Sequence, residues 1–260
     1  MENSKQFLET LARGIGLLDV ICNSPSPLGL SELSKQSDLN LSAIQRISHT
    51  LQAIGMIERD RNTKKYRIGP RMIALSLAAM ENLELKKVAF PIMEQLSRET
   101  NEMVGLGALF GSDIVLIESV IKTQQILNIN LKPGDFLPLN ATASGKVILA
   151  FLPESEVVKV LERDNLKKLT ANTVTSVSAF KDQMKKVRKC GYATAIDEGA
   201  EGFSTIAAPV RNGHGDVTAS LIIMVPTVRA KGDLLISSFR EKLVQNAAQI
   251  SAALGYPGEK

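Results

Sequence analysis

Four polar side chains near the N-terminus have the chemistry and the spacing to contact DNA. Ser42, Gln45, Arg46 and His49 fall at i, i+3, i+4 and i+7, so they share one face of a helix predicted over 41–54. In the major groove, Arg can bond O6 and N7 of guanine, and Gln can bond N6 and N7 of adenine. The Ser and His side chains could donate to bases or phosphates. An ordinary solvated helix face gives the same pattern, so the stripe alone does not distinguish a DNA-binding face from a solvated one.

Two alternatives concern the start of this helix. Ser42 and Gln45 match a capping box, which would occupy both side chains. If Asn40 caps the helix instead, both are free for DNA. On the opposite face, four apolar residues at helical spacing are expected to pack inward: Ile44, Ile47, Leu51 and Ile54.

The elements around this helix predict a winged helix-turn-helix. A helix over 7–22 is followed by a proline-rich break, a short helix over 32–36 with Ser31 as N-cap, and a turn over 37–40. Strands over 56–59 and 66–68 then flank a polar connection, as in a wing. We expect its cations to contact DNA phosphates without reading sequence. They are Arg59, Arg61, Lys64 and Lys65.

Composition limits the class of protein. The 260 residues are 44% apolar and 22% charged, with 31 Lys plus Arg against 27 Asp plus Glu, which fits one large soluble domain or two modest ones. The net charge of +4 conceals a segment of +5 between Ser42 and Arg71. Cys22 and Cys190 form no metal-ligand or disulfide pattern, so we expect no metal and no cofactor. Without a signal peptide or an apolar run of about 20 residues, a cytoplasmic, membrane-free location is expected.

The rest of the chain predicts an α+β domain. A connecting helix is expected over 71–84 and a further helix over 86–100. Hairpins joined to helices favour α+β over a doubly wound sheet. The expected strands cover 103–110, 114–121, 126–131, 192–196, 205–210 and 217–225, and the expected helices cover 144–151, 153–163, 178–190 and 232–254.

Enzyme motifs are incomplete. Ser144-Gly145-Lys146 resembles the end of a phosphate-binding loop, but Val147 and Asn140 stand where Ser or Thr and Gly are needed. The segment 202–206 lacks the last glycine of a nucleophile elbow. We therefore expect no catalytic residues. Small residues over 143–146 could instead offer backbone N–H groups to a carboxylate, or could form a packing turn, and the sequence does not separate the two.

The chain resembles the IclR-type (isocitrate lyase regulator) transcriptional regulators over nearly its full length. The shared motifs cover residues 11–14, 30–33, 42–46, 91–96, 139–146 and 206–210. The resemblance implies a winged helix-turn-helix domain over 1–70, a linker helix over 71–84 and a GAF-like mixed α/β effector-binding domain over 85–260. It also implies homodimers or tetramers on palindromic operators, which respond to a small organic acid or aromatic catabolite.

The resemblance also implies where an effector binds. The positions are Ala143, Ser144, Phe203, Ser204, Thr205, Ile222 and Met224. Asn140 stands where the family usually has histidine, and Ala195, Ile222 and Met224 replace polar or acidic positions of relatives that bind very small keto acids. A larger, partly apolar carboxylate is therefore favoured over glyoxylate or pyruvate.

Two other classes of protein stay open. One is an enzyme acting on a small acid with Ser144, Lys146 and Asp197, in which the DNA-binding module is accessory. The other is a DNA-organising protein without a ligand. The sequence names neither the effector nor the operator, and it does not distinguish a repressor from an activator.

Overall fold

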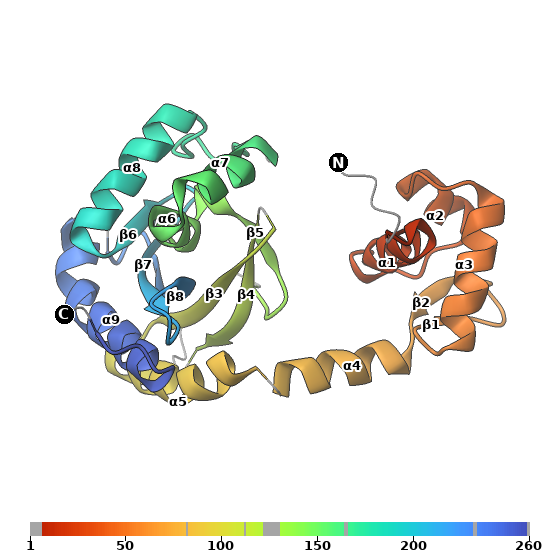
Figure 1. Cartoon of the computed structure of the whole chain (residues 1–260), viewed down its shortest axis with the longest axis horizontal. Helices are drawn as coiled ribbons and strands as arrows, with labels where there is room; N and C mark the ends of the chain where they lie inside the picture. The colour runs from red at the N-terminus through yellow and green to blue at the C-terminus, as the bar shows by residue number, and fades with distance from the viewer. Residues whose placement is uncertain are drawn as a thin grey trace. The chain divides into compact units, whose positions relative to one another are not determined.

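The computed structural model describes residues 7–81, 83–111, 113–121, 131–163, 166–230 and 233–258. The chain divides into two compact units, Met1–Leu83 and Glu84–Lys260. Figure 1 shows the helices of the first unit in red to orange and the sheet of the second in green to blue. Among the described residues, no helix combines the length and apolar character needed to cross a membrane.

The first unit is a helix-turn-helix with a two-stranded wing. Its elements are α1 (Glu9–Cys22), α2 (Leu30–Gln36), α3 (Leu41–Ala53), β1 (Ile57–Arg59), β2 (Tyr66–Ile68) and α4 (Pro70–Glu81). The two strands pair antiparallel, with Glu58 opposite Arg67. Leu17, Leu33 and Ile44 lie at the centre of its apolar core. Pro70 begins α4, as expected of a proline at the first position of a helix.

Two expectations for this unit are wrong. The short helix begins at Leu30 and not at Glu32, because the N-cap position is Gly29, whose N–H donates to the Glu32 carboxylate at 2.6 Å. Ile54 is 45% exposed and does not pack inward. It lies one residue beyond α3, where Gly55 takes a left-handed φ of 76° and the helical spacing no longer holds.

The second unit contains a six-stranded antiparallel sheet, in the order β5-β4-β3-β8-β7-β6. The strands are β3 (Met103–Phe110), β4 (Asp113–Val120), β5 (Phe136–Pro138), β6 (Ala193–Ile196), β7 (Phe203–Arg211) and β8 (Val217–Pro226). Met103 pairs with Met224, and Thr205 also pairs with Met224 from the other side. The strand expected over 126–131 falls mainly outside the described residues, and β5 was not expected.

Helices cover both faces of this sheet (Figure 1). On one face, α5 (Glu84–Thr100) and α9 (Asp233–Ala253) pack on alternate residues of β3, β7 and β8, such as Leu106, Ile206 and Ile223. The other face is covered by α6 (Ala143–Phe151), α8 (Val177–Cys190) and the short 3-10 helix η1 (Leu139–Ala141), while α7 (Glu154–Arg163) packs beside them. The fold is therefore α+β, as predicted.

One close approach fixes the start of α6. A Cβ added to Gly145 would lie 2.0 Å from the backbone oxygen of Leu139, which is far inside van der Waals contact. Glycine is therefore needed for η1 to fold back against α6. This geometry, and not phosphate binding, explains the glycine in the Ser144-Gly145-Lys146 segment.

We predict that Gly145→Ala destabilises the protein by about 3 kcal/mol or more, since the clash involves backbone that cannot rotate away. Gly16→Ala is the matched control, because nothing lies within 4 Å of its added Cβ and alanine is the better helix former. Thermal unfolding followed by circular dichroism measures both. Equal midpoints for Gly145→Ala and the unchanged protein would contradict the packing described here.

Candidate functional site

The polar stripe of α3 is free of the helix cap. The Asn40 side chain accepts a hydrogen bond from the Ala43 N–H at 2.9 Å, so Asn40 is the capping residue. All four residues of the predicted stripe, Ser42, Gln45, Arg46 and His49, are exposed. A shallow hollow is lined by three of them, Gln45, Arg46 and His49, together with Thr50. The stripe therefore has the exposure that a base-reading helix face requires.

The wing is ordered by one carboxylate. Asp60 accepts hydrogen bonds from the Asn62 N–H, the Thr63 N–H and the Thr63 hydroxyl at 2.7–3.0 Å. The bonds from Thr63 hold the pKa of the Asp60 carboxyl below its ordinary value. Lys64 takes a φ of 59°, which closes the turn between the two strands. An acidic residue in a basic wing thus serves to fold the wing.

The four wing cations are not equivalent. Arg59 lies over the Tyr66 ring, 5.4 Å from its centroid, and donates to the Lys64 carbonyl. Lys65 pairs with Glu32 at 3.3 Å. Arg61 and Lys64 are exposed, and no ion pair to either is found in the described part of the chain. These last two are the most available for phosphates.

The predicted effector residues lie mostly on the α6 face of the sheet. Ala143, Ser144 and Ile222 are buried there, and β-strand alternation places Thr205 and Met224 beside Ile222. The Ser144 hydroxyl bonds that of Ser220. The glycine at position 107 makes room for it, since a Cβ there would lie 2.4 Å from the Ser144 oxygen.

Ser204 does not share this face. Phe203, Ser204 and Thr205 are consecutive in β7, so the middle side chain points to the opposite face. It is fully buried there and bonds the Thr227 hydroxyl at 2.9 Å. The expectation that all three residues line one site is therefore wrong for Ser204, whose role here is structural.

The start of α6 is already capped. The Thr142 hydroxyl accepts from the Gly145 N–H at 3.1 Å, so that donor is not directed at an outside carboxylate. This cap, together with the close contact between Gly145 and Leu139, favours the packing-turn alternative for 143–146.

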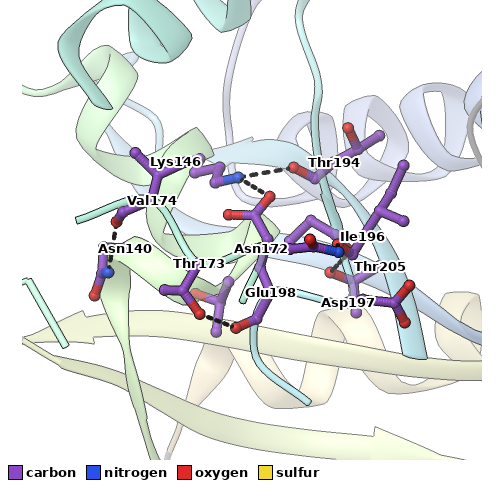
Figure 2. A network of polar contacts seen from close by, with 12 residues as sticks. Asn140, Lys146, Asn172, Thr173, Val174, Thr194, Ile196, Asp197, Glu198 and Thr205 are labelled. Atoms are coloured by element: carbon purple, nitrogen blue, oxygen red, sulfur yellow. Dashed lines mark hydrogen bonds and ion pairs between the residues drawn. The ribbon is translucent and has the colours of Figure 1, made fainter. Parts of the chain in front are cut away.

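A buried ion pair joins α6 to the turn after β6 (Figure 2). The Lys146 ammonium, 2% exposed, contacts the Glu198 carboxylate at 2.5 Å and donates to the Thr194 carbonyl at 3.2 Å. Burial lowers the pKa of Lys146, and Glu198 opposes that shift. The other carboxylate oxygen of Glu198 is buried without a hydrogen-bond partner among the described atoms.

The three residues of the enzyme hypothesis are occupied by different partners. Ser144 bonds Ser220, Lys146 pairs with Glu198, and the Asp197 carboxylate accepts from the Gly202 N–H and the Thr227 hydroxyl. They are not joined to one another as a nucleophile and its base would be. Nor does the described chain contain a cluster of three metal-ligating side chains.

Sequence reasoning missed a set of polar residues around this ion pair. Asn140 bonds two carbonyls of the segment 166–176, and side chains of that segment bond the turn after β6. Figure 2 shows Thr173 beside Glu198 and Asn140 beside Val174. In the sequence, Asn140 stands out only as a departure from the glycine of a phosphate-binding loop and from the histidine usual in the family. The Thr170 and Thr173 pair gave no recognisable motif, although a polar run between two helices is a signal that could have been followed.

Comparison with known proteins identifies both units. Residues 10–61 match the IclR helix-turn-helix domain, and residues 77–252 match the C-terminal domain of bacterial IclR transcriptional regulators. The chain is 30% identical over 251 residues to the HTH-type transcriptional regulator XynR of Escherichia coli, covering 96% of this chain and 99% of that protein. It is 31% identical to KdgR of the same organism, covering 98% and 96%.

Solved structures agree with these matches. The IclR of Thermotoga maritima is 28% identical, with a TM-score of 0.70 and coverage of 95% and 99%. An IclR homolog from Microbacterium hydrocarbonoxydans, solved with 4-hydroxybenzoate, shares the fold with a TM-score of 0.77 at 24% identity, covering 94% and 98%. The chain belongs to the IclR family of bacterial DNA-binding transcriptional regulators.

Proposed function

We propose that this regulator binds a palindromic operator sequence-specifically, and that a small organic acid or aromatic catabolite in the second unit controls the binding. The observation that carries the proposal is the exposed stripe on α3, freed by the Asn40 cap and followed by a basic wing. Arg46 and Gln45 read bases, and Ser42 and His49 support them. A ligand controls binding by favouring one of two arrangements of the paired DNA-binding units.

The wing contributes affinity that does not depend on sequence. Arg61 and Lys64 contact phosphates first, because neither has to leave an ion pair to do so. Arg59 and Lys65 also contact phosphates, although Lys65 must first leave its ion pair with Glu32. Neutralising phosphates releases counterions, so the affinity falls as salt rises.

A homodimer is supported by an apolar groove in the first unit. The groove holds about 720 Å³ between α1 and α3. Leu8, Leu11 and Ile15 line it and are more than half exposed. Soluble monomers rarely leave such a patch uncovered. A second copy is the occupant that a palindromic operator requires, since each half-site needs its own recognition helix. A tetramer would pair two such dimers.

An effector with an apolar body is supported by the residues on the α6 face. Ala195, Ile222 and Met224 offer no charge to a very small acid, and Phe203 adds an aromatic side chain on the same face. The family member solved with 4-hydroxybenzoate has an aromatic acid bound. We therefore favour a larger, partly apolar carboxylate over pyruvate.

The first of four predictions from this proposal concerns base reading. Arg46→Ala should relax the base preference at one position of the half-site and weaken operator binding by about 1–3 kcal/mol, since a bidentate contact to guanine is lost. The operator is first selected from random duplexes by the unchanged protein, and anisotropy titrations then compare single-base variants of it. Arg98→Ala, with the same change of charge on α5, is the control. Unchanged operator affinity for Arg46→Ala would mean that another side chain reads the bases.

The second prediction concerns the wing. Lys64→Ala should weaken binding to all duplexes alike and reduce the slope of log affinity against log salt by about 1 per lost phosphate contact. Titrations at four salt concentrations measure the slope, with Lys185→Ala on α8 as the matched control. A loss confined to the selected operator would assign Lys64 to base reading instead.

The third prediction concerns assembly. Ile15→Glu should shift the protein toward smaller species in sedimentation velocity and weaken operator binding, because it places a charge in the apolar groove. Ala12→Glu is the control, because it adds the same charge at an exposed position of α1 that does not line the groove. If Ile15→Glu sediments like the unchanged protein, the groove is not the contact between copies.

The fourth prediction concerns the effector. In calorimetry, 4-hydroxybenzoate or a related aromatic acid should bind with higher affinity than pyruvate, because the α6 face is mainly apolar. Tight pyruvate binding without a response to larger acids would overturn this preference. If no acid in a metabolite collection alters the melting temperature or operator binding, a DNA-organising protein without a ligand becomes the better interpretation.

A further inference from the structure

The segment 166–176, which we name the strap, crosses from α7 to α8 and is fastened along one edge by Asn140. The Asn140 amide nitrogen donates to the carbonyls of Lys167 at 3.0 Å and Val174 at 2.9 Å. Both protons of one amide therefore hold carbonyls that are seven residues apart in the chain. A hydroxyl or a neutral imidazole has one proton to donate and could hold only one of the two.

The other edge of the strap is fastened to the turn after β6. The Thr170 hydroxyl donates to the Asp197 carbonyl and the Thr173 hydroxyl to the Glu198 carbonyl, each at 2.6 Å. The Thr173 hydroxyl also accepts from the Thr170 N–H at 2.9 Å, so the strap turns around this side chain. Figure 2 shows Thr173 directly beside Glu198.

The strap closes over residues that have little exposure. Asn140, Lys146 and Glu198 beneath it are buried. Leu166 and Val174 of the strap pack against the apolar cluster that includes the predicted effector positions Ala143 and Ile222. A small molecule can reach this cluster from the side of the strap only if the strap moves.

The fastening is of a kind that can open locally. Among the described residues, each hydrogen bond that joins the strap to Asn140 or to the turn after β6 has a side chain on at least one end, whereas the sheet below is joined by backbone ladders. A backbone bond from the Phe180 N–H to the Ser176 carbonyl ties the last residue of the strap to α8. Breaking side-chain bonds releases the strap without separating any strand. Such segments open at lower free energy than the sheet they cover.

We propose that Asn140 is a positioning residue that latches the strap as a lid over the α6 face, and that small molecules enter when this latch releases. The assignment of an effector to this face rests on the proposed function. The latch itself is a property of the ligand-free protein, and it is tested there. Failure of the latch and failure of the proposed effector are therefore distinguishable.

Hydrogen exchange measures the opening of the strap. In Asn140→Leu, which keeps the approximate shape but has no donor, amides of 166–176 should exchange roughly tenfold to a hundredfold faster, since two hydrogen bonds are lost. In Asn140→His, which keeps one donor, these exchange rates should fall between those of the unchanged protein and of Asn140→Leu. Thr173→Val, which removes the hydrogen bond at the other edge of the strap, should also raise them. Amides of β3, β8 and α9 should keep their rates. The matched control is Thr100→Val, which removes a hydroxyl bonded within α5.

Acetylation of Lys146 by acetic anhydride measures access beneath the strap. In the unchanged protein Lys146 should be protected relative to Lys185, which is exposed on α8. In Asn140→Leu and Thr173→Val, its acetylation should rise severalfold while that of Lys185 stays constant. The proposal is overturned if strap exchange and Lys146 acetylation are unchanged in both variants, or if they rise only together with exchange throughout the sheet.

Discussion

The second unit depends on one buried ion pair. Lys146 on α6 and Glu198 after β6 are 52 residues apart, and together they connect a helix to the edge of the sheet. Removing two charges from water is costly, so the pair persists only where geometry and further bonds offset that cost. Lys146 gains the Thr194 carbonyl, and the backbone of Glu198 is held by Thr173. An unpaired charge would remain buried if either partner were lost, which constrains α6, the turn and the strap to keep their arrangement.

In the first unit, too, side chains supply hydrogen-bond partners to polar groups that would otherwise lack them. Asn40 satisfies an N–H at the start of α3, and Asp60 satisfies two in the wing. Each of these side chains completes the backbone hydrogen bonding of its own element. The neighbouring polar residues, Gln45, Arg46 and Lys64, are thereby left exposed for a partner. The surface proposed to face DNA is thus left open by the placement of the caps.

The sequence predicted what short-range patterns determine. Helical spacing identified α1, α3 and α8, and strand–turn signals identified β3 with β4 and β7 with β8. Ile54 was misplaced because the spacing was extended one residue past the end of α3. Ser204 was misplaced although strand alternation alone separates it from Phe203 and Thr205. Helical spacing ends where the helix ends, and alternation holds at every residue of a strand.

Other features could not be read from the sequence, since they join distant residues. Ser144 meets Ser220, and Asn140 meets Val174, across 76 and 34 residues. No periodicity encodes such pairs, because they depend on how η1, α6 and the sheet pack together. The effector positions were therefore predicted without the strap that is proposed to cover them.

The proposed lid limits how an effector can act. A ligand shifts an equilibrium only by the difference in its affinity for the two states. A compound that bound equally well beneath an open and a closed strap would leave the strap population unchanged, however tightly it bound. The polar groups that can supply such a difference are those whose partners change when the strap moves. Glu198 is the foremost of these, because its backbone is bonded by the strap and its carboxylate by α6. An effector that interacts differently with this residue in the two states would have a physical means to move both elements.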